Sequence, residues 1–165
     1  MPRIGQYKHQ SSPRCGRRFK KNGPQSIGKS RGGRTTKIHI LAANDRTGLT
    51  FCLSPGQADD AQNGRHLLQN WEHNLPKIPL VMDGAYEGDE TRKCVSKCGF
   101  QPVVPPKSNR LKPWIYDKVI YKRRNEIERL FRRLKAFRRV FSRFEKLDLM
   151  FTAFIQIALI MEMIQ

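Results

Sequence analysis

The sequence predicts an α/β domain in which a layered sheet is flanked by helices, and three observations support this fold class. The chain has 165 residues, about the length of one domain. Its hydrophobic content of 38% is sufficient for a globular core. After an initial hairpin, strand-like segments alternate with helix-like segments, as is typical of α/β folds.

The first part of the chain divides into a basic arm and a hairpin. Residues 1–33 are rich in Gly, Ser, Pro, Lys and Arg with little periodicity, which predicts a mobile arm. The folded domain is then expected over residues 34–165. Within it, polar and apolar residues alternate over Thr35–Ala43, a turn follows, and Leu49–Ser54 resumes the pattern. This arrangement predicts a β-hairpin.

Helices and strands alternate in the middle of the chain. A helix is expected from Asp59 or Asp60 to about Glu72, and the apolar segment Ile78–Met82 predicts a buried strand. Asp89 can cap a helix that runs to about Cys98 and ends before a glycine. A short strand is expected over Gln101–Val104, where two prolines follow.

Two helices are predicted at the end of the chain. The first is long and basic and runs from about Lys118 to Phe144. The second, Leu147–Ile164, is the most apolar part of the chain. Three polar residues interrupt it, and it is shorter than the ~20 apolar residues that span a bilayer. We therefore expect a buried core helix and no membrane partner.

The cellular compartment is predicted from the cysteines and from the first residues. No apolar segment of a signal peptide is found near Met1. The four cysteines contain no CxxC pair and are too few for a disulfide framework. Cys94 and Cys98 share one helix face but lack two further zinc ligands. These observations favour a reducing, cytoplasmic location.

Positive charge is concentrated in two segments. Lys and Arg number 32 against 14 Asp and Glu, which gives a formal net charge of +18. Residues 1–37 contain no acid, and residues 110–146 carry a second excess of cations, so the rest of the chain is slightly acidic. Segregated positive charge is typical of proteins that contact a phosphate backbone.

The long basic helix places four polar side chains on one stripe. At 100° per residue, Tyr121, Arg124, Glu128 and Lys135 fall within about 60° of one another. The core-facing side adjoins this stripe, so Glu128 sits at the edge of the buried face. That side is apolar and comprises Ile127, Leu130, Phe131, Leu134, Phe137 and Phe141. Two plainer interpretations remain open: Glu128 could pair with Arg124 or Arg132 one turn away, and Asp83 could be a turn or cap residue.

These residues carry a resemblance to a known family. The spacing Tyr-x2-Arg-x3-Glu-x6-Lys and the string YKRRNEIERLFRRLK resemble the catalytic-Glu helix of DDE transposases of bacterial insertion sequences. The string VMDGAYEGDETR resembles the segment around that family's second catalytic Asp. KKNGPQSIGKSRGGRTTKIHILAA and LSPGQADDAQNGRHLL resemble the stretches before it. The resemblance covers roughly residues 20–165.

The resemblance implies an RNase H-like mixed sheet flanked by helices, and cleavage and joining of DNA with two Mg2+ ions. Two such ions can stabilise both the attacking and the leaving oxygen of a phosphodiester. Asp83 and Glu128 would be the catalytic metal ligands, because Mg2+ prefers carboxylate oxygens. The DNA contacts would come from Tyr121, Arg124, Lys135, Arg132, Arg139, Arg31 and Arg34. Transposon ends and target DNA are the implied partners, with the chain itself or full-length transposase as an oligomeric partner.

One element of the family pattern is absent. The family has a first carboxylate in a strand upstream of the segment matched by residues 20–33, but no Asp or Glu precedes Asp45. The segment 1–19 does not resemble the family either. We therefore expect a catalytically incomplete fragment in which the first, central strand of the sheet is missing.

Two alternative functions follow from the same sequence. A non-catalytic DNA-binding protein could modulate intact transposase, and its binding would fall steeply with salt. A small basic RNA-binding protein would not explain the stripe on the basic helix. Nucleotide binding is not indicated, since GKSRGG lacks the spacing of a phosphate loop. His39, within a predicted strand, is expected to be structural.

Overall fold

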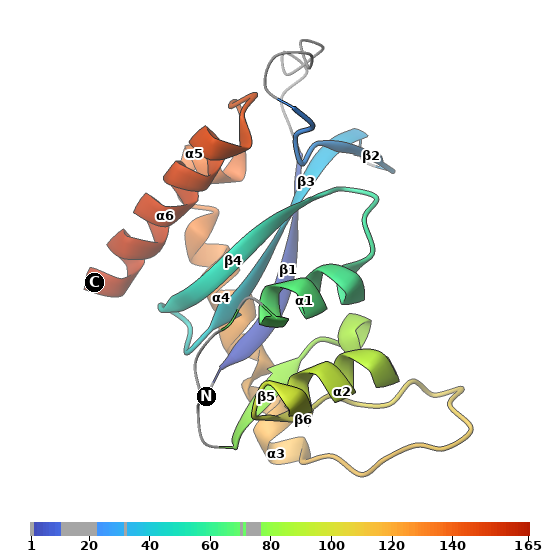
Figure 1. The fold of residues 1–165 in the computed structure, drawn as a ribbon. Coiled ribbons are helices and arrows are strands. Elements are labelled where there is room, and N and C mark those ends of the chain that lie inside the picture. Colours follow the sequence, from blue (N-terminus) through green and yellow to red (C-terminus); the bar gives the residue numbers. More distant parts are fainter. Residues whose placement is uncertain (1, 11–22, 32, 70, 72–76) are drawn as a thin grey trace.

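The computed structural model describes residues 2–10, 23–31, 33–69, 71 and 77–165. In these residues, six strands form one mixed sheet (Figure 1). The strands are β1 (Arg3–Gln10), β2 (Gly28–Ser30), β3 (Gly33–Ala42), β4 (Gly48–Pro55), β5 (Ile78–Met82) and β6 (Phe100–Val103).

The order of the sheet is β2-β3-β1-β5-β6, with β4 also paired to β3. β1 runs antiparallel to β3, with Arg3 opposite Ala42, and parallel to β5, with Ile4 opposite Met82. β5 and β6 are parallel, whereas β2 and β4 are both antiparallel to β3. β1 is therefore a central strand with neighbours of opposite direction on its two sides.

Helices cover both faces of this sheet (Figure 1). One face carries α1 (Asp60–Gln69) and α2 (Asp89–Lys97). The other carries α4 (Asn125–Leu134), α5 (Arg138–Phe141) and α6 (Asp148–Ile164). Three short helical segments lie near the ends of β5 and α4: η1 (Gly84–Tyr86), α3 (Lys118–Tyr121) and η2 (Lys122–Arg124).

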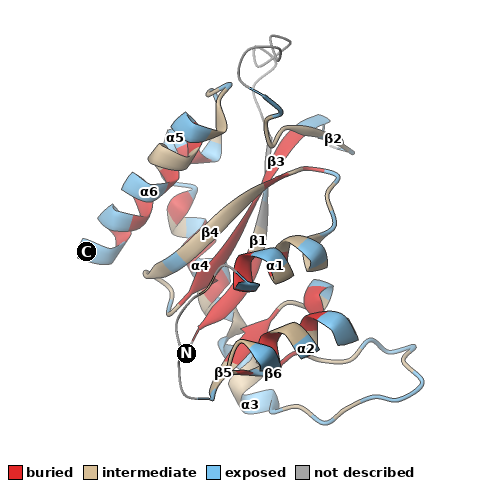
Figure 2. Cartoon of the chain, viewed as in Figure 1, coloured by how far each residue is buried: buried red, intermediate tan, exposed pale blue. Residues whose placement is uncertain are grey.

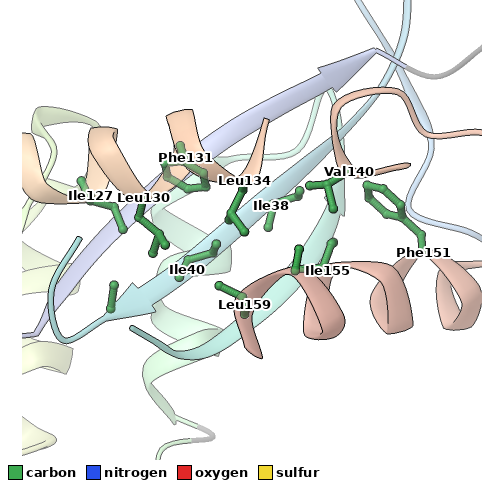
Figure 3. Packing of buried hydrophobic residues seen from close by; sticks show 12 residues of the cluster. Ile38, Ile40, Ile127, Leu130, Phe131, Leu134, Val140, Phe151, Ile155 and Leu159 are labelled. Atoms are coloured by element: carbon green, nitrogen blue, oxygen red, sulfur yellow. The ribbon is translucent and has the colours of Figure 1, made fainter. Parts of the chain in front are cut away.

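Each face has its own hydrophobic core. Alternate residues of β3 point to opposite faces, so Ile38 and Ile40 pack against α4 and α6 while Leu41 packs towards α1 (Figure 3). The buried side of α6 faces this sheet and its other side is exposed (Figure 2). Among the described helices, none is both long and apolar enough to span a membrane.

The mixed sheet flanked by helices confirms the expected fold class. The β3–β4 hairpin, β5, β6, α2 and α6 lie within one or two residues of their predicted positions. α1 begins at Asp60 as predicted, although its expected end at Glu72 lies outside the described residues. Asp89 is not the cap of α2. Gly88 occupies that position, Asp89 is the first residue of the helix, and its carboxylate pairs with Arg110.

The expectation of a missing central strand is wrong. Residues Arg3–Gln10 form that strand, and Gly28–Ser30 form another, although both fall within the predicted arm 1–33. β1 is rich in polar residues and shows no hydrophobic alternation. It is fixed by continuous pairing with β3 and by complete burial of Ile4. Residues 11–22 of the predicted arm lie outside the described residues.

The single long helix predicted over 118–144 is also wrong. α3, η2 and α4 follow one another from Lys118 to Leu134, but Phe137 has an extended backbone with ψ at 108°. The chain turns there, so Val140 reaches the core and Phe141 is exposed, opposite to the helical-wheel prediction. Packing of α5 on α6 thus overrides the local helix pattern.

Candidate active site

Asp83 lies at the carboxyl end of β5, where the strand ends and η1 begins. Its Oδ1 accepts a hydrogen bond of 3.1 Å from the Ala85 backbone N–H, so the carboxylate caps η1. The side chain is 45% exposed. Capping fixes one carboxylate oxygen and leaves the other, Oδ2, directed towards η2.

Arg124 brings two carboxylates together. Its Nη1 lies 3.3 Å from Asp83 Oδ2 and 2.6 Å from Glu128 Oε1. The contact with Glu128 spans one turn, from η2 into α4, whereas the contact with Asp83 joins segments distant in sequence. A single guanidinium nitrogen therefore contacts both carboxylates, next to the carboxyl end of β5.

Tyr121 completes the group on the same side of the helix. Asp117 caps α3 by accepting from the backbone N–H groups of Val119 and Ile120, at 2.8 and 2.9 Å. The Tyr121 ring meets Tyr116 edge to face, with centroids 5.6 Å apart. Burial raises the pKa of Tyr121 and Arg124 opposes this shift, so the phenol stays protonated at neutral pH and can donate a hydrogen bond.

A buried cation attaches this helix to the central strand. Arg3, fully buried in β1, contacts Glu126 of α4 at 2.5 Å and donates to the carbonyl oxygens of Arg123 and Ala43. Burial lowers the pKa of Arg3, and the negative charge of Glu126 opposes this effect. Sequence analysis missed this contact; the available signal was an arginine inside a strand.

A buried polar chain supports the segment that carries Asp83. The Tyr86 hydroxyl of η1 lies 3.1 Å from His39 Nδ1, and His39 Nε2 lies 2.8 Å from Ser54 Oγ. A neutral imidazole has one donor and one acceptor nitrogen, so it suits two hydroxyl partners. Burial lowers the pKa of His39 to about 4, so the ring is neutral. The structural role expected for His39 agrees with this geometry.

The remaining predicted DNA contacts lie on α4, on α5 and near β2. Lys135 ends α4 and, like Arg132, is exposed. Arg139 pairs with Glu145 at 2.6 Å and its guanidinium stacks on Phe154. Arg31 and Arg34 are exposed beside β2, at the end of the sheet away from α3 (Figure 1). The structure thus gathers Asp83, Tyr121, Arg124 and Glu128. Arg132 lies one turn beyond Glu128 on α4, and Lys135, Arg139, Arg31 and Arg34 lie farther along the chain from this group.

The family model for the transposase DDE domain matches residues 8–163. The chain belongs to that family. Two solved structures are similar at low identity. One, a piggyBac transposase synaptic complex with hairpin DNA, has 12% identity and a TM-score of 0.42. The match covers 67% of this chain and 23% of the piggyBac chain.

The second structure is the catalytic core domain of BIV integrase, with 14% identity and a TM-score of 0.48. The match covers 96% of this chain and 80% of the integrase chain. The chain therefore spans under a quarter of the piggyBac chain and most of the integrase core. A search of curated proteins found no match.

The carboxylates of this DDE domain fit one hard cation better than two. Mg2+ is commonly held by one or two carboxylates plus water and substrate phosphates, which Asp83 and Glu128 could satisfy. The described residues contain no group of three or more His, Cys, Asp or Glu suited to a metal. A two-metal site therefore lacks a ligand within the described part of the chain.

The central strand of the DDE domain has little space for the missing carboxylate beside Asp83. Ile4 is opposite Met82, so Gly5 comes next to Asp83 in the parallel register. A Cβ at Gly5 would lie 2.6 Å from Ile127 Cγ1 and 3.0 Å from the Phe131 ring. A side chain at this position would therefore require Ile127 and Phe131 to shift from the close packing of β1 on α4.

Proposed function

We propose that this DDE domain binds DNA in the transposition of an insertion sequence, with Asp83 and Glu128 as its metal-ligating carboxylates. The observation that carries the proposal is the joint contact of Arg124 with both carboxylates. A divalent ion held there would supply positive charge to a DNA phosphodiester. The protein would act in the cytoplasm, where bacterial DNA is located.

Cationic side chains around the carboxylates would hold the DNA backbone. Arg124 would contact a phosphate oxygen beside the two carboxylates, and Tyr121 can donate a hydrogen bond or stack on a base. Arg132 and Lys135 extend the exposed, positively charged side of the helix beyond Glu128. Arg139 contributes less, because Glu145 already neutralises its charge.

We propose further that the chain by itself does not cleave DNA. The close packing at Gly5 disfavours a carboxylate beside Asp83, and Arg124 already supplies a cation between the two that are present. This geometry favours the second candidate function, a non-catalytic DNA-binding protein that modulates intact transposase. Full-length transposase would then supply the complete site, and this chain would join it or another copy of itself as an oligomeric partner.

The test combines DNA binding with a nicking assay on the purified chain. Duplex DNA is titrated over a range of salt concentrations with Mg2+ or with a chelator, and supercoiled plasmid is incubated with Mg2+ or Mn2+. We expect strongly salt-dependent binding that needs no metal, and no nicking. The variant Arg132→Ala/Lys135→Ala should bind more weakly than a control, Lys93→Ala/Lys97→Ala, on the exposed side of α2.

Each result bears on one part of the proposal. Absence of DNA binding at low salt would overturn the DNA-binding function. Metal-dependent nicking that disappears in Glu128→Gln would show that the site is complete and would overturn the non-cleaving assignment. Nicking that persists in Glu128→Gln comes from a contaminating nuclease and leaves the non-cleaving assignment standing.

A further inference from the structure

A basic groove of about 530 Å³ lies beside β2. β2 is at the end of the sheet away from α3 (Figure 1). Four cations line the groove: Lys8 of β1, Lys29 of β2, Lys37 of β3, and Arg31 in the turn after β2. We propose that this groove binds phosphates of the DNA backbone as a second anchoring site. The proposal rests on the proposed function, since it assigns a further contact to the same DNA.

The strand register places like charges directly opposite one another. Lys8 is opposite Lys37 in the β1–β3 pair, and Lys29 is opposite Arg34 in the β2–β3 pair. Like charges at opposed positions of antiparallel strands destabilise a sheet. The two pairs lie on opposite faces of the sheet, because Lys37 and Arg34 occupy odd and even positions of β3, and Arg34 does not line the groove. Each pair adds positive charge to this end of the sheet, and Asp60 offsets the charge of Lys37.

Only one of the groove's cations is neutralised by a described carboxylate. Lys37 Nζ lies 2.5 Å from Asp60 Oδ1 and donates to the Ala58 carbonyl oxygen at 2.6 Å, so this charge is buried and fixed. Lys8, Lys29 and Arg31 are exposed. No ion pair between these three side chains and a described carboxylate is formed. They are therefore available for a ligand with several negative oxygens.

The floor of the groove is shaped by close backbone packing. A Cβ at Gly56 would collide with Thr35 Oγ1, and one at Gly28 would collide with Gln57 Oε1. The Gly56 N–H donates to the Thr35 carbonyl oxygen at 3.0 Å. The hydroxyls of Thr35 and Ser30 lie 3.0 Å apart at this floor. Thr35 donates to Ser30, and Ser30 donates to the Gly33 carbonyl oxygen, so these hydroxyls fix the floor of the groove. The cations around this floor would contact the phosphate oxygens.

The length of β1 sets an approximate spacing between the two sites along the sheet. Lys8 is five residues from Arg3 along β1, or about 17 Å at the rise of a strand. Arg3 contacts Arg123 next to the carboxylate site. Phosphates of one B-DNA strand advance ~3.4 Å per base pair, so about five base pairs span this distance. A duplex that contacts both sites would therefore span about that many base pairs.

The experiment compares salt dependence of duplex binding in matched variants of the full chain. Lys29→Ala/Arg31→Ala removes two exposed groove charges, and Lys93→Ala/Lys97→Ala removes two exposed charges from α2. Each phosphate contact adds ~0.9 to the slope of log affinity against log salt. We expect the groove variant to lose about 1.8 of slope and about tenfold in affinity at low salt. Circular dichroism and melting check that each variant is folded.

The outcomes separate the groove from the proposed function. If the unmodified chain does not bind DNA, both proposals fail. If it binds and the groove variant retains the slope of the control, the groove proposal alone is overturned. Lys8→Ala gives an independent check, with an expected loss of ~0.9.

Two further arms identify the source of the phosphate. The salt slope of Lys29→Ala/Arg31→Ala is also measured with duplex RNA. If the variant loses slope with duplex RNA but not with duplex DNA, the assignment to DNA is overturned. Inorganic phosphate at constant ionic strength should weaken binding of the unmodified chain more than that of Lys29→Ala/Arg31→Ala. Equal competition in both proteins would contradict a phosphate site in the groove.

Discussion

Arg124 lies 3.3 Å from Asp83, although 41 positions separate them in the sequence. The same guanidinium nitrogen contacts Glu128 at 2.6 Å, so the two carboxylates that the family resemblance assigned to metal binding share one protein cation. Arg124 and a divalent ion would compete for the same two oxygens. Binding of a divalent ion to both carboxylates would therefore require it to displace Arg124.

Replacement of Arg124 by alanine is expected to expose this competition. The contacts are partly exposed, so their loss should cost under about 1 kcal/mol of stability. The two carboxylates would then repel each other and be free for a cation. Mn2+ should therefore raise the melting temperature of Arg124→Ala more than that of the unmodified chain. In Arg124→Ala/Asp83→Asn the difference should disappear; equal Mn2+ shifts in all three proteins would contradict the competition.

Arg3→Met should strongly destabilise the chain. The substitution leaves Glu126 without its buried partner and removes a donor to the Ala43 carbonyl oxygen, at an expected cost of about 3–5 kcal/mol. Urea unfolding gives the free-energy change. The control is Arg123→Met, since Arg123 contacts the same Glu126 from an exposed position and should cost under about 1 kcal/mol. Similar losses in both variants would refute the role assigned to the buried pair.

Stability should fall as the pH drops from 6.5 to 4, because His39 is held neutral. Its pKa is lowered from 6.5 to about 4 in the folded chain. Between these values the unfolded state binds a proton that the folded state excludes, so this contribution is fully present above pH 6.5. The linked loss by pH 4 is about 3 kcal/mol. Urea unfolding at a series of pH values measures it.

The variant His39→Gln tests the origin of this pH dependence. Glutamine keeps a donor and an acceptor but does not titrate, so the slope between pH 6.5 and 4 should flatten. The control is His66→Gln on the exposed side of α1, which should retain the slope. An unchanged slope in His39→Gln would assign the pH dependence to other groups.

Gly64→Ala should destabilise the chain even though alanine favours helices. A Cβ at Gly64 of α1 would lie 2.5 Å from the Tyr86 ring, whose hydroxyl is held by His39. Overpacking costs about 1–3 kcal/mol, against a gain of at most about 1 kcal/mol in helix propensity. In Gly84→Ala no atom lies near the added Cβ, so the change should stay within about 0.5 kcal/mol. Thermal melts of both variants show whether each substitution raises or lowers stability.

Local pattern predicted those elements whose own residues carry the signal. The β3–β4 hairpin has clear alternation and a turn, β5 is a short apolar run, and α6 is apolar along its length. β1 gave no such signal, because its polar residues are accommodated by pairing with β3 and by the partner of Arg3. The end of α4 was also missed, since packing of Val140 redirects the chain.

The sequence alone determined the two charge-rich segments, the hairpin, and the stripe that puts Tyr121, Arg124 and Glu128 on one helix side, because these depend on composition and on periodicity within a segment. Only the tertiary structure decided that Arg124 would reach Asp83, that close packing at Gly5 would disfavour a carboxylate, and that Lys8 would face Lys37. Each of these contacts joins residues distant along the chain. Strand register and helix packing fix them, and a local pattern does not contain that information.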